Sequence, residues 1–155
     1  MAVGKVKFID TTISTAIAEL VSKCDHRTLV LWATDCSEHV LIFFEEKNLT
    51  DKRPRQAIEA GRAWACGEIA MSEARTAAFA AHAAARETLE AATCAAARAA
   101  GHAAATAHVA SHAVHAATYA AKAATYASDP ADANANNAKE RNWQFQQLFD
   151  LGGFH

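Results

Sequence analysis

Apolar residues recur every three or four positions along most of the chain, which is the period of an amphipathic helix. Between residues 27 and 47 this pattern places Leu29, Trp32, Cys36, Val40 and Phe44 on one face. We therefore expect a helix there that is a central packing element of the core. Because residues 40–44 form a short apolar run, a strand is the alternative, but the helical stripe continues on both sides of that run.

Helix caps, prolines and glycines divide the chain into seven expected helices. Thr11 or Thr12 can cap the first helix, and Pro54 suits the first turn of the third. The expected ranges are about 11–22, 27–47, 54–71, 72–86, 88–100, 102–127 and 130–149. Gly101 either ends a helix or lets a second helix approach closely. The sequence thus predicts an all-α, single-domain bundle of six or seven helices over residues 1–155, with its core between about 11 and 149.

Alanine dominates residues 90–127, and about forty residues of the whole chain are alanine, several times the usual share. Alanine is the strongest helix former and has almost no side chain, so helices that are rich in it can pack closely. With 52% hydrophobic residues the chain can form a core, and most of its large apolar side chains precede residue 89 or follow residue 142.

The formal net charge of −2 gives no electrostatic footprint for nucleic acid or for an anionic membrane. The four cysteines have no CxxC spacing and are expected to be reduced, as in a cytoplasmic protein. The first ten residues lack the apolar region of a signal peptide, and three histidines and Lys122 within residues 103–127 argue against a membrane span. We therefore expect a cytoplasmic protein with neither a nucleic-acid partner nor a membrane partner.

A stripe of large polar side chains interrupts the alanines at the spacing of a helical face: His108, His112, His115, Tyr119, Lys122 and Tyr126. These side chains can pack against a neighbouring helix, bind a partner or meet a second copy of the chain as a homo-oligomer. Another interpretation is a metal site formed by His108, His112 and His115 with a carboxylate from another helix. The chain contains no HExxH motif and no Glu-x-x-His motif, so nothing further supports a metal.

Two other groups of residues are candidates for a chemical role. Asp35 and His39 are four residues apart, and a carboxylate can orient an imidazole for acid–base work, although an ordinary surface pair is the simpler interpretation. Residues 51–55 (DKRPR) precede a helix and could bind an anion, unless Asp51 caps that helix and the arginines pair with Glu59. No phosphate loop, nucleophile elbow or dinucleotide fingerprint occurs, so we expect no enzymatic activity.

Three segments carry a resemblance to a known family. They are residues 51–64 (DKRPRQAIEAGRAW), residues 99–109 (AAGHAAATAHV) with His112, and residues 140–144 (ERNWQ). In their order and spacing they resemble the bacterial putative immunity protein family with an Imm-5-like domain, over roughly residues 27–148. The chain departs from the family pattern after Gln144, where it has Leu148-Phe149-Asp150 in place of the usual leucine-proline ending.

The resemblance implies an all-helical, non-enzymatic cytoplasmic protein that neutralises a cognate protein toxin by binding it, with no cofactor. The alternative function is a helical metal- or small-molecule-binding protein that uses its histidines. We expect His102 and Thr106 to belong to a polar network completed by Trp143, Gln144 and an arginine. The candidate partner- or ligand-binding residues are Asp51, Arg53, Arg55, Trp64, His102, Thr106, His108, His112, His115, Tyr119, Trp143 and Gln144.

Overall fold

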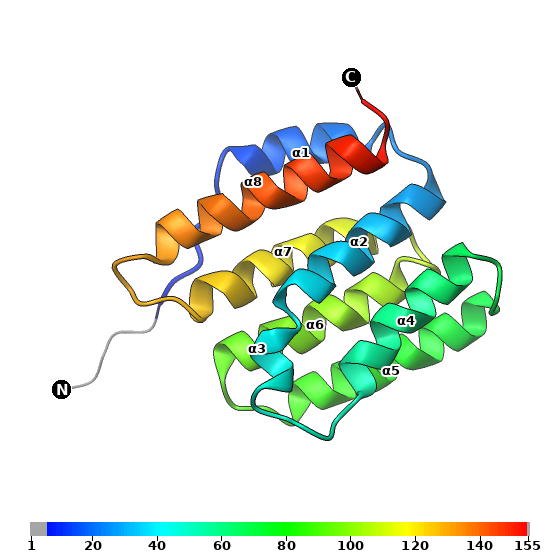
Figure 1. Ribbon diagram of the computed structural model, residues 1–155, viewed down its shortest axis with the longest axis horizontal. Coiled ribbons are helices and arrows are strands. Elements are labelled where there is room, and N and C mark those ends of the chain that lie inside the picture. The colour runs from blue at the N-terminus through cyan, green and yellow to red at the C-terminus, as the bar shows by residue number, and fades with distance from the viewer. Residues whose placement is uncertain (1–5, 155) are drawn as a thin grey trace.

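Eight α-helices make up the regular structure of residues 6–154, the part of the chain that the computed structural model describes. They are α1 (Ile13–Val21), α2 (His26–Val40), α3 (Ile42–Glu45), α4 (Arg53–Ala65), α5 (Met71–Arg86), α6 (Ala91–Ala105), α7 (His112–Tyr126) and α8 (Ala133–Leu151) (Figure 1). No strand occurs within residues 6–154, so the predicted all-α class is confirmed.

The long helices lie side by side in layers, with α1 and α8 on one side of the molecule and α4 and α5 on the other (Figure 1). Helix α6 packs against α5 and α7 and also contacts α2, α3 and α4. Helix α2 contacts α4, α6, α7 and α8, so the predicted central role of α2 is shared with α6.

The core combines a few large side chains with two faces of alanine. Trp32, Phe44 and Leu148 are fully buried, and the burial of each such side chain contributes about 1.5–3 kcal/mol. The Trp32 indole donates a hydrogen bond to the Gln144 carbonyl at 2.9 Å, which satisfies its only polar group. Helices α6 and α7 pack against each other and contribute alanines that are at most 4% exposed to the main hydrophobic cluster: Ala95, Ala96, Ala99, Ala103, Ala113, Ala116, Ala117, Ala120 and Ala123.

The predicted helix over residues 27–47 is present but is divided at Leu41 into α2 and α3. Leu41 keeps helical dihedral angles (φ −59°, ψ −28°), and its amide donates to the carbonyl of Glu38, three residues earlier. The division is therefore one tightened turn, which raises the helix number to eight. The strand alternative for residues 40–44 is wrong, because these residues are helical or in this turn.

The break between α6 and α7 lies later in the chain than the expected break at Gly101. Helix α6 continues through Gly101 to Ala105, and the chain turns over residues 106–111. Gly101 is a point of close approach: a Cβ atom there would lie 2.6–2.7 Å from ring atoms of His82 on α5. At the end of α6, the carbonyl oxygen of Thr106 lies 2.6 Å from Nε2 of His26, so a side chain satisfies one of the final carbonyl groups.

Other helix ends follow local chemistry. The Asp25 side chain accepts a hydrogen bond from the amide of Thr28 at 2.7 Å and caps α2. Pro54 lies in the first turn of α4, as predicted. The last helix begins at Ala133, three residues after its expected start. Within residues 6–154 no helix combines the length and the hydrophobicity that crossing a lipid bilayer requires.

Candidate functional site

The candidate residues chosen from the sequence do not form one site. Four of them, His102, His112, His115 and Tyr119, form a cluster of aromatic rings between α6 and α7. The eight residues outside this ring cluster are Asp51, Arg53, Arg55, Trp64, Thr106, His108, Trp143 and Gln144. The single polar network expected around His102 is therefore only partly present.

His102 is the centre of the ring cluster. Its Nδ1 atom lies 3.0 Å from Nδ1 of His112, and its ring stacks on Tyr119 with centroids 5.2 Å apart and planes 12° apart. His115 lies 5.4 Å from His102 between ring centroids. His82 of α5 makes an edge-on contact with His102, with ring centroids 4.8 Å apart. Three helices thus contribute imidazoles to one cluster.

The sequence reasoning missed two members of this cluster, His82 and Arg98. Nη1 of Arg98 lies 3.2 Å from Nδ1 of His82, which places a guanidinium beside the imidazoles. The only sequence signal for His82 is Gly101, whose missing side chain leaves room for the His82 ring. That signal identifies a close contact but not the residue that makes it.

The environment of the cluster disfavours protonated histidine. Burial, with help from neighbouring imidazoles and Arg98, lowers the pKa of His102 to about 3. Burial, Arg98 and Arg86 lower the pKa of His82 to about 4, and burial also lowers the pKa of His112. These rings are therefore neutral at pH 7, and each offers one donor and one acceptor nitrogen.

The histidine set considered for a metal is not assembled. His108 lies in the turn between α6 and α7, where its Nδ1 is 3.3 Å from the sulfur of Met71. The ring centroids of His112 and His115 are 5.9 Å apart. Among the described residues, no three His, Cys, Asp or Glu side chains are arranged to hold a metal ion.

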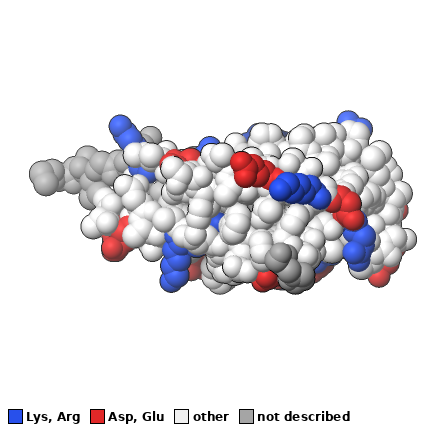
Figure 2. Space-filling view, turned by 90° about the horizontal axis from the view of Figure 1, so that it is seen from above, with Lys and Arg blue, Asp and Glu red and all other residues white. Residues whose placement is uncertain are grey.

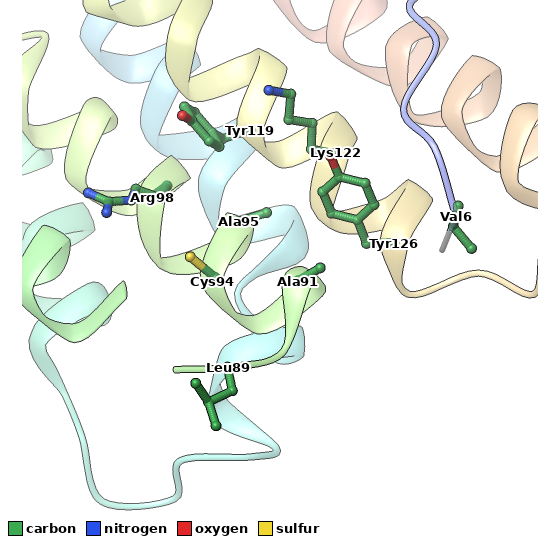
Figure 3. Close-up of a pocket in the computed structure, with 9 residues that line it drawn as sticks. All are labelled: Val6, Leu89, Ala91, Cys94, Ala95, Arg98, Tyr119, Lys122 and Tyr126. Carbon is green, nitrogen blue, oxygen red and sulfur yellow. The ribbon is translucent and has the colours of Figure 1, made fainter. Parts of the chain in front are cut away.

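A groove of about 630 Å³ lies beside the ring cluster, between α6 and α7 (Figure 3). Helix α6 lines it with Ala91, Cys94, Ala95 and Arg98, and helix α7 lines it with Tyr119, Lys122 and Tyr126. Val6 and Leu89, which lie outside both helices, complete the lining. Tyr119 belongs both to this groove and to the ring cluster, so the orientation of its ring is set by His102. The sequence stripe indicated Tyr119, but it did not identify Arg98 as its neighbour across the groove.

A second cluster lies between α2 and α8 around His39. Its imidazole stacks flat on Trp143, with centroids 3.8 Å apart, and its Nδ1 lies 2.6 Å from Oε2 of Glu140. The Glu140 side chain is only 10% exposed, and burial raises its pKa. Asp35 does not take part in this pair, because its carboxylate accepts hydrogen bonds from Arg62 and Gln147. The expected Asp35–His39 surface pair is therefore not formed, and each of the two side chains contacts other helices instead.

Gln144 lies next to Trp143 in sequence but belongs to the core. Its amide nitrogen donates to the carbonyl of Ala117 at 2.8 Å, and its amide oxygen accepts from Arg141 at 3.0 Å. Arg141 is only 2% exposed and also donates to both carboxylate oxygens of Asp10. This network fastens α8 to α7 and to the segment before α1, which is a structural role.

The arginines near residue 51 are already neutralised. Arg53 pairs with Asp51 at 2.7 Å and with Glu87 at 2.5 Å, while Arg55 pairs with Glu45 at 2.6 Å. The expected pairing of these arginines with Glu59 is therefore wrong. The Arg53 hydrogen bonds lower the pKa of Asp51 and of Glu87. Because carboxylates occupy both guanidinium groups, this segment is poorly suited to bind an anion.

Trp64 and Thr106 lie together at the end of α4 and α6. The Trp64 ring packs on His26 with centroids 4.8 Å apart, and His26 in turn contacts the Thr106 carbonyl. The buried Thr106 hydroxyl donates to the carbonyl of His102 at 2.8 Å. Both candidate residues therefore secure the turn that follows α6.

Comparison with known proteins gives one match. A search of the curated proteins and a search of the solved structures found no match. The family model described as "Imm-5 like putative immunity protein" matches residues 19–151, which include all helices from α2 to α8 and the end of α1. Because this match covers most of the chain, the protein belongs to the Imm-5 like putative immunity protein family.

Proposed function

We propose that this chain is a bacterial immunity protein that binds a cognate protein toxin in the cytoplasm and neutralises it without catalysis. The observation that carries the proposal is the family match over residues 19–151. In this proposal the chain is a single binding domain. Its surface is complementary to the toxin, and neutralisation involves binding without a chemical reaction.

The state of the reactive side chains supports a binding role. The thiol of Cys36 is fully buried, and burial raises its pKa well above the usual value, so it is a poor nucleophile. The carboxylate of Asp35 is held by Arg62 and Gln147, and His39 is held by Glu140 and Trp143. All four cysteines are free thiols, as expected in a reducing cytoplasm.

The surface charge supports recognition by shape and by a few local pairs. On the face shown in Figure 2, acidic and basic side chains are scattered and interspersed within a mostly uncharged surface. Such a surface lacks the broad field that steers a protein to a highly charged partner. The contact area with a toxin would therefore rely on aromatic and apolar side chains with a small number of ion pairs.

Co-expression tests this proposal directly. A toxin encoded beside the gene is induced in bacteria with and without this chain, and growth is measured. We expect growth to be restored by the chain and a stoichiometric complex to form with an inactive toxin variant in light scattering. Continued growth arrest together with no complex would refute the proposal.

A further inference from the structure

We propose that the groove between α6 and α7 is the docking site for a partner segment that carries a carboxylate beside an apolar side chain. The inference rests on the proposed function and names the part of the surface that meets the partner. The groove combines two tyrosine rings and a surface of alanines with two cations that form no ion pair among the described residues (Figure 3).

The cations of the groove lack acidic partners. Within residues 6–154, Arg98 and Lys122 form no ion pair, whereas Arg53, Arg55 and Arg62 each bind a carboxylate. The Arg98 guanidinium hydrogen-bonds to neutral His82, and this partner does not compensate its positive charge. An incoming carboxylate can therefore accept charge-assisted hydrogen bonds here without displacing an existing acid.

Lys122 is held in place by aromatic rings. Its ammonium nitrogen lies 4.8 Å from the Tyr119 ring centroid and 5.6 Å from that of Phe8. These cation–π contacts position the ammonium group but leave its charge and its N–H donors available. Arg98 on α6 and Lys122 on α7 both line the groove, so each of these helices contributes one cation to it (Figure 3).

The rest of the groove suits an apolar side chain. Ala95 and Cys94 offer a shallow apolar surface on α6, and Tyr119 and Tyr126 offer rings on α7. The stacking of Tyr119 on His102 fixes its ring before binding, which reduces the entropy lost on docking. Tyrosine and arginine are among the residue types that are enriched where binding energy concentrates in protein interfaces.

Charge also selects the occupant. A two-fold contact between copies through this groove would bring Arg98 and Lys122 of both copies together, and such like-charge contacts are unfavourable. Nucleic acid needs a larger basic surface than two cations on a chain of net charge −2. A protein segment with one or two carboxylates matches the charge and the size of the groove.

The first test uses a defined probe and the full chain. The peptide acetyl-Gly-Glu-Phe-Glu-Gly-amide and its counterpart with Gln in place of both Glu are titrated into isotopically labelled protein, and shifts are followed by NMR. We expect the acidic peptide to shift resonances of Cys94, Arg98, Tyr119 and Tyr126 and to bind more weakly as salt is added. The Gln peptide should bind about tenfold more weakly or worse.

Matched variants decide whether the groove is responsible. Lys122→Met alone and Arg98→Met with Lys122→Met should weaken the acidic peptide, the double variant by about tenfold or more. Lys139→Met, which removes an exposed cation on α8, should leave the affinity unchanged. Shifts confined to another surface, equal binding of both peptides, or dimerisation of the chain through this groove would each overturn the proposal.

The same variants separate this proposal from the proposed function. In the co-expression test, groove variants should fail to protect while Lys139→Met protects. If the unmodified chain and the groove variants protect equally, the chain is an immunity protein and the docking site is wrong. If the acidic peptide binds in the groove but no toxin is neutralised, the ligand chemistry of the groove is supported and the proposed function is wrong.

Discussion

The Nδ1 atoms of His102 and His112 lie 3.0 Å apart, so a hydrogen bond between two imidazole rings joins α6 to α7. This contact requires one ring to carry its proton on Nδ1 and the other to be unprotonated there, because two Nδ1–H groups would repel each other. The lowered pKa values of both rings keep this arrangement in place at neutral pH.

We expect the free energy of unfolding to decrease as the pH is lowered from 7 to 5. In the folded protein the pKa is about 3 for His102 and about 4 for His82, below the value of about 6.5 expected in the unfolded chain. The unfolded chain therefore binds protons first, and the stabilisation present above pH 6.5 is lost as the pH falls towards the folded values. The loss should be on the order of 1 kcal/mol per histidine by pH 5, measured by denaturant unfolding.

Two variants test whether the buried histidines cause this pH dependence of stability. His102→Gln should reduce the loss of stability between pH 7 and 5, because the most strongly shifted imidazole is gone while His82 keeps its own contribution. His108→Gln, on an exposed histidine in the neighbouring turn, should retain the slope of the unmodified chain. Equal stability of the unmodified chain at pH 7 and pH 5 would show that the cluster does not resist protonation.

Gly101→Ala should destabilise the protein, although alanine normally favours a helix over glycine by about 1 kcal/mol. The new Cβ would lie 2.6 Å from the His82 ring, so the substitution should cost roughly 1–3 kcal/mol in urea unfolding. In a His82→Ala background the same change should become stabilising, because the obstructing ring is absent. A stabilising effect in the unmodified background would show that α5 and α6 can move apart at no cost.

Gln144→Leu should lower the free energy of unfolding by about 1–3 kcal/mol, because it removes the side-chain hydrogen bond to the Ala117 carbonyl from a buried polar network. The change also removes the acceptor for the buried Arg141 guanidinium. The matched control is Gln146→Leu on the same helix, where the side chain is exposed and bonds only to Asp150. Similar losses for the two variants in thermal unfolding would count against the buried network.

Chelation should leave the thermal stability unchanged. Among the described residues no three suitable side chains surround a metal position, and His108 is engaged with Met71. Protein purified without an affinity tag is analysed for metals, and its Tm is measured with and without EDTA. Stoichiometric metal together with a lower Tm after chelation would establish the metal-binding alternative.

The all-α fold class was predictable because apolar spacing and alanine content are local properties of the sequence. The turn over residues 106–111 was not, because it contains neither glycine nor proline and is secured by contacts from distant residues such as His26. Gly101 was recognised as a special position, but only the packing of His82 distinguishes a close contact from a helix end.

The candidate site was harder to predict for the same physical reason. Neighbours along one helix, such as His112, His115 and Tyr119, follow from helical spacing and do lie together. Partners from other helices depend on how the helices pack, which brought His82 to His102 and Glu140 to His39 without a local signal. The spacing of residues along one helix therefore predicts which side chains of that helix lie together, but it does not predict which side chains of other helices face them.

The alanine-rich packing of α6 against α7 means that buried and outward-facing positions of these helices tolerate substitution differently. The buried positions already have the smallest side chain that keeps a helix, so almost any replacement there forces the backbones apart. The outward positions, including Arg98, Lys122 and Tyr126, meet no such limit because they face a groove. Related chains can therefore diversify the exposed face of this helix pair and acquire new partners while the distance between its two backbones stays fixed.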